Sequence, residues 1–149
     1  MEYFAHSQKA FVYKYVVMMS DTDQFKHMSF ANYLKLMFLA TDALCLSCLD
    51  EDFLKEKRLR LTSARMQFKK QTAPGGHILI KVNSSEINGP RFSLLHTFLV
   101  EGTAELVALG RQTYEVSKLE SETPCELSDS LKGVLEPIHV DEEHLLYKY

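Results

Sequence analysis

"SFANYLKLMFLATDALCLSCL", residues 29–49, is the stretch of the sequence that decides the fold. It is mostly apolar and helical in character, and its polar residues share one narrow stripe of a helical wheel, namely Asn32, Lys35, Asp42, Ser47 and the following Asp50. Its 21 residues are enough to cross a membrane, but Lys35 and Asp42 argue against a membrane span. A helix that is polar along a single stripe has to be covered by protein on nearly all sides, and a strongly curved sheet would provide that cover.

Strand-like segments flank this helix on both sides. Before it, residues 9–19 alternate in hydropathy, with Phe11, Tyr13, Tyr15, Val17 and Met19 on one face. After it, a charged connection at 50–58 leads to four further segments. They lie at about 60–71 (where Thr62, Ala64, Met66 and Phe68 alternate with polar residues), 77–87, 91–101 and 104–118.

Turn signals separate these later segments. Pro74-Gly75-Gly76, Asn88-Gly89-Pro90 and Gly102-Thr103 predict hairpin connections. Short connections make consecutive strands antiparallel neighbours. The order of one strand, one long helix and four strands therefore predicts an α+β fold, with a curved antiparallel sheet wrapped around one long central helix.

Length and composition indicate one globular domain. The 149 residues suit a single domain over 1–149, with a core at about 9–118 and a polar C-terminal extension, 119–149, that holds one short helix around 127–135. The hydrophobic fraction is 46%, and the net charge of −3 gives no general reason to expect nucleic acid or an anionic membrane as the partner. The start, "MEYFAHSQKAFVYKY", lacks the basic and apolar regions of a signal peptide, so we expect a cytoplasmic protein.

The later strands carry apolar residues on both faces. Leu95 and Leu99 oppose Phe98 and Val100, and only one of the two faces can lie on the central helix. The other face needs cover. We therefore expect a homodimer or homotetramer.

The three cysteines predict structural thiols. Cys45 and Cys48 have the C-x-x-C spacing, but no second pair or histidine cluster completes a zinc site. A redox motif would open a helix, whereas this pair lies within the expected one. We expect buried thiols, no metal and no cofactor.

The residues in front of the helix are ionisable. "SDTDQFKHM", residues 20–28, places Asp21, Asp23 and His27 directly before the apolar run. Such a loop is commonly turn and capping chemistry, with Ser29 as the N-cap. The start of a helix, however, also has backbone N–H groups without intrahelical partners, and negative charge is stabilised there.

This stretch and the order of elements resemble the hot-dog fold thioesterases. The chain is most similar to the 4-hydroxybenzoyl-CoA thioesterase family, including its Tol-Pal-associated acyl-CoA thioesterase branch. That family shows an Asp-x-Asp loop, a glycine three residues on, and a tyrosine ten residues after the second aspartate; Asp23 and Tyr33 keep this spacing, and Lys26 stands at the glycine position. "MQFKKQTAPGGHILIKV" and "ELVALGRQTYEV" also resemble later strands of the family. The related enediyne polyketide thioesterases carry asparagine and a helical arginine where this chain has Asp23 and Leu39.

The resemblance implies thioester hydrolysis with Asp23 as the catalytic carboxylate, either as base or as nucleophile. An aspartate is normally ionised at neutral pH. His27 could orient the substrate or polarise its carbonyl, or it could be a loop histidine bonded to backbone. Ser29, Phe30 and Tyr33 begin a helix that could line an acyl pocket, and Asp21 reads as a turn or bracing residue. His77 and His96 form no pattern with other ligands, and we assign them no role.

Seven basic residues lie in "KEKRLRLTSARMQFKK", residues 55–70. They can form a solvated face, a cradle for the phosphates of coenzyme A that includes Lys69 and Lys70, or a nucleic-acid surface. Only Phe68 interleaves as a stacking aromatic, which disfavours nucleic acid.

The sequence thus predicts a thioesterase that acts on acyl-CoA or acyl-carrier-protein thioesters. The chief alternative is a non-catalytic module that binds acyl chains or a partner protein on the same fold. RNA binding through residues 55–70 is a second alternative.

Overall fold

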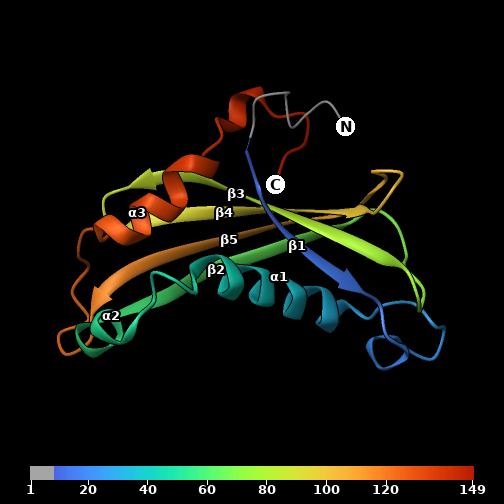
Figure 1. Cartoon of the computed structure of the whole chain (residues 1–149), viewed down its shortest axis with the longest axis horizontal. Helices are drawn as coiled ribbons and strands as arrows, with labels where there is room; N and C mark the ends of the chain where they lie inside the picture. The colour runs from blue at the N-terminus through green and yellow to red at the C-terminus, as the bar shows by residue number, and fades with distance from the viewer. Residues whose placement is uncertain (1–8) are drawn as a thin grey trace.

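The computed structural model describes residues 9–149, so the first eight residues of the predicted domain and of the N-terminal stretch lie outside it. In chain order the main elements are β1 (Phe11–Val16), α1 (Phe30–Cys45), α2 (Glu51–Glu56), β2 (Lys57–Phe68), β3 (His77–Asn88), β4 (Arg91–Val100), β5 (Leu106–Lys118) and α3 (Asp129–Leu135). Short 3-10 turns are η2 (Met19–Asp21), η3 (Glu136–Ile138) and η4 (Glu142–His144). Figure 1 shows a five-stranded sheet with α1 on one side and the last residues, 139–149, on the other.

The sheet is antiparallel, in the order β1-β3-β4-β5-β2. The predicted hairpins β3–β4 and β4–β5 are confirmed. The predicted hairpin between β2 and β3 is wrong, because β2 pairs with β5 at the far edge of the sheet. The Gly75-Gly76 turn bonds to β1 instead: the Gly75 N–H donates to the Val17 carbonyl (2.8 Å) and the Val17 N–H to the Gly76 carbonyl (2.9 Å). These bonds place β3 beside β1.

Helix α1 is shorter than the sequence indicated. It has 16 residues instead of the expected 21 and ends at Cys45, where Cys48 and Leu49 both donate their N–H to the Cys45 carbonyl. The expected charged connection at 50–58 is a second helix, α2, followed directly by β2. Asp50 begins α2 by accepting a hydrogen bond from the Phe53 N–H (2.9 Å), and the buried Phe53 side chain anchors it. Cys45 and Cys48 are buried and form no disulfide within residues 9–149, but Cys48 lies beyond the end of α1.

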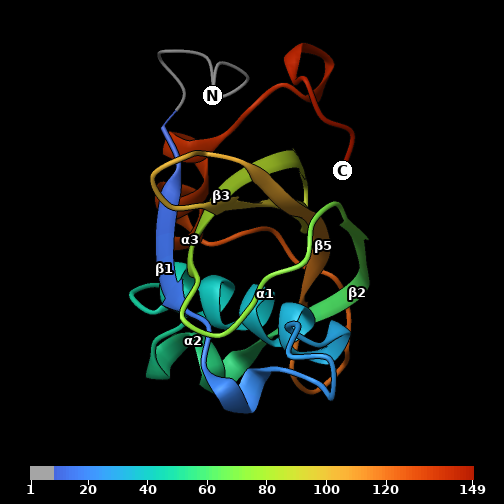
Figure 2. The same cartoon turned by 90° about the vertical axis from the view of Figure 1, so that its right-hand side faces the viewer.

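One side of α1 packs on the sheet. Its buried residues are Tyr33, Leu36, Met37, Ala40, Thr41, Leu44 and Cys45. In the end-on view of Figure 2, β1 and β2 lie on either side of the helix. The opposite side holds the expected Lys35 and Asp42, but Phe38 is there too and is 39% exposed. The exposed side of α1 is therefore wider and more apolar than the predicted polar stripe.

The strand β2 changes phase in its middle. The pairing register with β5 shifts between Leu61 and Ser63. In a regular strand an odd-numbered and an even-numbered residue point to opposite faces, but here Leu61 and Met66 both pack against the core. The single alternation predicted over Thr62 to Phe68 therefore breaks at its start, because a bulge reverses which residues face inward.

The C-terminal segment packs on both sides of the sheet. Leu127, Leu131, Leu135 and Ile138, from α3 and its flanks, join the main core, and the short helix predicted around 127–135 is confirmed. Residues 139–149 cross the other side of the sheet, where Val140 and Tyr149 cluster with Leu95 and Leu109. The cover that we expected from a second subunit is thus supplied there by the chain itself. None of the helices within residues 9–149 is long and apolar enough to cross a membrane.

Candidate active site

A tight loop, residues 22–28, connects η2 to α1. Thr22 and Met28 pair as an antiparallel bridge, and the Asp23 N–H donates to the His27 carbonyl (2.9 Å). Lys26 adopts φ = 59°, the left-handed conformation that glycine reaches most easily. Lysine at the family's glycine position therefore still has a backbone conformation that glycine favours.

Asp23 both shapes this loop and faces a pocket. Its Oδ1 accepts the Phe25 N–H at 2.8 Å and the His27 N–H at 3.4 Å. The residue is exposed and lines a pocket of about 450 Å³. The turn interpretation of the Asp-Thr-Asp loop is therefore correct for its structure, and it leaves the carboxylate accessible from the pocket.

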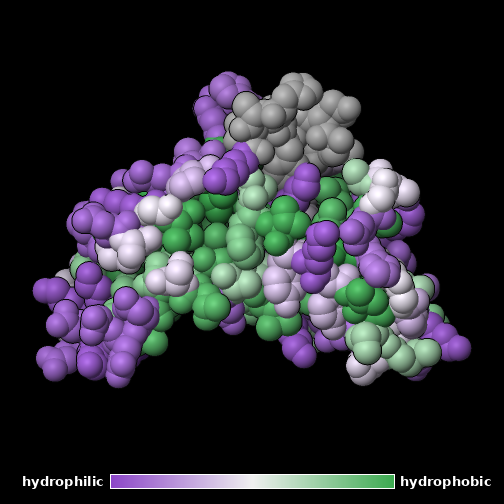
Figure 3. All heavy atoms as spheres, in the orientation of Figure 1, coloured by the Kyte–Doolittle hydropathy of each residue, from purple (hydrophilic) through white to green (hydrophobic). Residues whose placement is uncertain are grey.

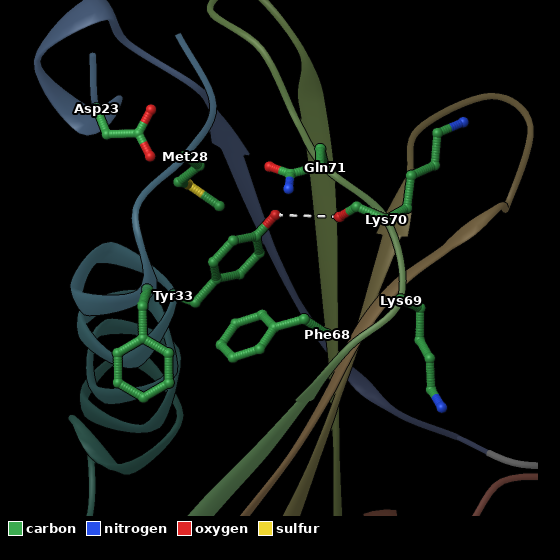
Figure 4. A pocket seen from close by; sticks show the side chains of 8 residues that line it. Asp23, Met28, Tyr33, Phe68, Lys69, Lys70 and Gln71 are labelled. Carbon is green, nitrogen blue, oxygen red and sulfur yellow. Dashed lines mark hydrogen bonds between the residues drawn. The ribbon is translucent and has the colours of Figure 1, made fainter. Parts of the chain in front are cut away.

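The pocket lies between the loop, the start of α1 and the end of β2 (Figure 4). It is lined by Asp23, Met28, Phe30, Tyr33, Phe68, Lys69, Lys70 and Gln71. The Phe68 ring contacts both Phe30 and Tyr33, with centroids 5.2 Å apart in each pair. One wall of the pocket is thus aromatic, and Asp23 provides a carboxylate at its rim.

Tyr33 forms part of the buried wall of the pocket. Its ring is buried, and its hydroxyl lies 3.0 Å from the Thr72 Oγ1 and 3.5 Å from the Lys70 carbonyl. Burial raises the pKa of Tyr33, so the hydroxyl stays protonated at neutral pH. Tyr33 is a core residue that also lines the pocket.

The start of α1 lies at the same place. Ser29 occupies the N-cap position, but its hydroxyl makes no capping hydrogen bond; its backbone carbonyl accepts from Asn32 and Tyr33 at 3.1 and 3.3 Å. The N–H groups of Phe30 and Ala31 have no acceptor within residues 9–149. This end of the helix is positively polarised and carries two free donors.

Lys69 and Lys70 line the pocket mainly through their backbone. Both of their N–H groups donate to the Val107 carbonyl, and Figure 4 shows both side chains directed away from Tyr33. The Lys70 ammonium pairs with Glu105 at 2.5 Å. Two other basic groups of the 55–70 segment are also paired, Arg60 with Glu115 and Arg58 with Glu122.

The histidines are dispersed. His27 is half-buried and does not line the pocket, and its imidazole has no hydrogen-bond partner in the described part of the chain. His77 is exposed beside Glu101, and His96 is buried in the core near Thr41. Among residues 9–149, no group of three His, Cys, Asp or Glu side chains could hold a metal ion.

Several site residues were not identified from the sequence. Met28 carried no signal beyond its apolar character, and Phe68 was noted only as a strand residue and as an aromatic among basic residues. Gln71 and Thr72 come from the connection after β2, and Met28 donates its N–H to the Thr72 carbonyl (2.9 Å). The turn signal at 74–76 predicts a hairpin back onto β2, and such a hairpin would not place this connection beside the loop.

Comparison of the chain with models of protein families gives a match. The family model described as the thioesterase-like superfamily matches residues 17–135. No curated protein sequence shows a significant match to the chain.

Three solved structures illustrate the likeness in fold. A 1,4-dihydroxy-2-naphthoyl-CoA thioesterase from Synechocystis has a TM-score of 0.78 at 18% identity, covering 85% of this chain and 96% of that one. The dynemicin thioesterase has a TM-score of 0.82 at 16% identity, with coverages of 89% and 99%. A hypothetical protein from Staphylococcus aureus, solved in complex with CoA, has a TM-score of 0.79 at 15% identity and covers 97% of both chains. At these identities the likeness concerns the fold alone.

Proposed function

This chain belongs to the thioesterase-like superfamily, and from that premise we propose that it hydrolyses acyl thioesters of coenzyme A or of an acyl carrier protein. The observation that carries the proposal is one pocket lined both by Asp23 and by Phe30 and Tyr33 of the first turn of α1. The Asp23–Tyr33 spacing supports a relationship to the 4-hydroxybenzoyl-CoA thioesterases and their Tol-Pal-associated branch. The position of α1 against the sheet supports the hot-dog arrangement, with α1 as its central helix.

The proposed chemistry uses two parts of the pocket. The Phe30 and Ala31 N–H groups would donate to the thioester oxygen as it becomes negative, and the loss of one such donor typically costs about 3–4 kcal/mol of barrier. Asp23 would either take a proton from the attacking water or attack the carbonyl carbon itself. In the second route an anhydride between the acyl group and Asp23 forms, and water then cleaves it to regenerate the Asp23 carboxylate. In both routes the C–S bond breaks, the acyl group ends as a carboxylic acid, and the departing sulfur is protonated to a thiol.

The remaining candidates have supporting roles in this proposal. Phe30, Tyr33 and Phe68 would contact the apolar part of the substrate, and Ser29 would place the first turn of α1. Lys69 and Lys70 are proposed to attract the phosphates of the carrier from the pocket rim. His27 is not among the residues that line the pocket. Its proposed contact with the substrate is therefore limited to a part of the substrate that extends beyond the pocket.

We also propose a homodimer or homotetramer. Figure 3 shows apolar atoms gathered over α1 and β1 on one face of the molecule, and Phe30 and Phe38 are 60% and 39% exposed. The strand β2 leaves one edge of the sheet unpaired within the described chain. Light scattering of the purified protein measures the assembly, and a monomer mass at micromolar concentration would reject this part of the proposal.

The decisive experiment is thiol release from a panel of acyl-CoA and acyl-carrier-protein thioesters. We expect turnover by the native protein and a loss of about a hundredfold or more in Asp23→Asn. Asp52→Asn, at an exposed aspartate of α2 outside the pocket lining, is the matched control and should keep full activity. Full activity in Asp23→Asn would reject the catalytic assignment. Tight acyl-CoA binding without any turnover would instead support the non-catalytic acyl-binding module.

A further inference from the structure

The other aspartate of the Asp-Thr-Asp loop is almost entirely buried. Asp21 is only 8% exposed, between the end of β1 and the start of α1. Its Oδ2 accepts two hydrogen bonds, from the Tyr15 hydroxyl and from the Met18 N–H, each at 2.7 Å. A buried carboxylate is costly unless it is paired in this way, so the two donors hold it in a defined position.

The backbone of the same residue binds α1. The Asp21 carbonyl accepts the Asn32 Nδ2–H at 2.6 Å and the Ser29 N–H at 3.0 Å. Asp21 therefore connects β1, the η2 turn and the first turn of α1. The loop that carries Asp23 begins one residue later and ends at Met28, beside Ser29.

We propose that Asp21 is a positioning residue, which with Tyr15 and Asn32 holds the Asp23 carboxylate in place relative to the free N–H groups of α1. This inference rests on the function proposed above. Asp21 does not line the pocket. Its side chain points to β1, so it contacts the loop on the side away from the pocket. The geometry separates the two aspartates into one that is buried and bonded and one that is exposed to the pocket.

The Tyr15–Asp21 contact persists over the working pH range of an enzyme. The hydrogen bond to Asp21, together with burial, raises the pKa of Tyr15 to about 12. The hydroxyl therefore keeps the proton that it donates at any pH near neutrality.

The first test removes only the Tyr15 donor. Tyr15→Phe should lower kcat about tenfold or more with KM within twofold, because a misplaced catalytic group slows the chemical step. Tyr13→Phe is the matched control: Tyr13 is half-buried on the same face of β1, and its hydroxyl has no hydrogen bond within residues 9–149. Equal kcat values in the two variants would overturn the proposal. So would a loss in Tyr15→Phe that parallels a fall in thermal midpoint, since that is the result of a purely structural role.

The second test compares the Asp→Asn substitution at position 21 with the same substitution at position 23. Asn in place of Asp21 keeps an oxygen that can accept from Tyr15 and Met18, so Asp21→Asn should cost less than tenfold in kcat. Asp23→Asn should cost about a hundredfold or more. The reverse ranking would overturn the proposal, because it would make Asp21 the reacting carboxylate.

A third measurement does not depend on turnover. The Phe25 and His27 amides donate to the Asp23 Oδ1, so their hydrogen-exchange rates report the position of that carboxylate. Tyr15→Phe should speed both exchanges while Tyr13→Phe should not. If the native protein releases no thiol, the proposed hydrolysis fails, and these rates still decide whether Tyr15 and Asp21 hold Asp23: unchanged rates would overturn that claim.

Discussion

At the scale of single residues, His96 is an ionisable group inside the core. It is fully buried between α1 and the sheet, and its Nε2 lies 3.1 Å from the Thr41 Oγ1. The Thr41 hydroxyl donates its one hydrogen to the Gln112 Oε1 (2.6 Å), so Nε2 must be the donor in the contact with Thr41. Burial without a charged partner keeps the imidazole neutral, so Nε2 carries its single proton.

This burial makes stability depend on pH. Desolvation lowers the pKa of His96 to about 3, whereas an unfolded chain protonates the same histidine near pH 6.5. The unfolded state thus binds a proton first as the pH falls, and His96 favours the fold fully only above pH 6.5. We expect the native protein to lose about 2 kcal/mol of unfolding free energy from this group between pH 7 and pH 5.

Urea denaturation at several pH values measures this loss. His96→Gln should flatten the pH dependence over that interval, whatever its own stability at pH 7. His139→Gln, at an exposed histidine, should keep the native slope. Parallel curves for native protein and His96→Gln would contradict the assignment.

The candidate site was readable from the sequence only where a residue type and its spacing carried the information. Asp23, Ser29 and Tyr33 follow one another at fixed distances along the chain, and the structure brings Asp23 and Tyr33 to one pocket. The environment of each group was not readable. Nothing in the sequence indicates that Asp21 is buried and Asp23 exposed, because that difference depends on Tyr15, which belongs to another element.

At the scale of elements, the packing of α1 on the sheet depends on a glycine in β5. A Cβ built on Gly110 would lie 2.3 Å from the Met37 sulfur and 3.3 Å from its Cγ. The absence of a side chain at Gly110 lets Met37 of α1 pack closely against β5. His96 pairs with Gly110 on the neighbouring strand, so the close contact adjoins the buried polar group.

Two glycine-to-alanine substitutions should therefore have opposite signs. Gly110→Ala should lower the free energy of unfolding by about 1–3 kcal/mol, because Met37 must move within a filled core. Gly133→Ala, inside α3 and with no atom within 4 Å of the added Cβ, should raise it by about 0.5–1 kcal/mol. Chemical denaturation decides both, and a stabilised Gly110→Ala would show that α1 can shift away from the sheet freely.

The elements themselves were predicted better than their pairing. Hydropathy and turn residues located the five strands and α3, because both signals are local. The end of α1 was missed because Leu46 and Leu49 continue its apolar pattern past the turn. The partner of β2 was missed because the Pro74-Gly75-Gly76 signal is the same whether the chain turns back on β2 or, as here, onto β1.

At the scale of the whole molecule, residues 139–149 form a strap across the sheet. One end is fixed at β3, where the Val140 N–H donates to the Ser84 carbonyl (2.9 Å). The middle is held by Arg111, which pairs with Glu142 at 2.6 Å and Glu86 at 2.7 Å. The far end reaches β2, where Arg65 donates to the Tyr149 carbonyl. The strap therefore occupies sheet surface that another subunit would otherwise have to cover.

Removal of its central contact should release the strap without unfolding the protein. A charge-assisted hydrogen bond contributes about 1.5–3 kcal/mol, so Arg111→Met should raise chymotrypsin cleavage after Leu145 to Tyr147 about tenfold or more. Arg91→Met breaks a different Arg–Glu pair, with Glu115, and should leave this cleavage at the native rate. Equal cleavage in all three proteins would show that the other contacts of the strap, among them those of Ser85 with Glu142 and of Arg65 with Tyr149, hold it without Arg111.

The pairing of β2 with β5 has a consequence for how the protein is made. The ribosome releases β1, α1 and β2 before the strands β3, β4 and β5 against which they pack. The first residue of β2, Lys57, pairs with the last residue of β5, Lys118, so this pairing cannot form until Lys118 has been made. Because non-local pairs form late, the sheet on which the apolar α1 packs stays incomplete until residue 118 has emerged. We expect the nascent chain to need protection by chaperones throughout that interval, and a ribosome-bound chain stalled before β5 to remain sensitive to protease along α1.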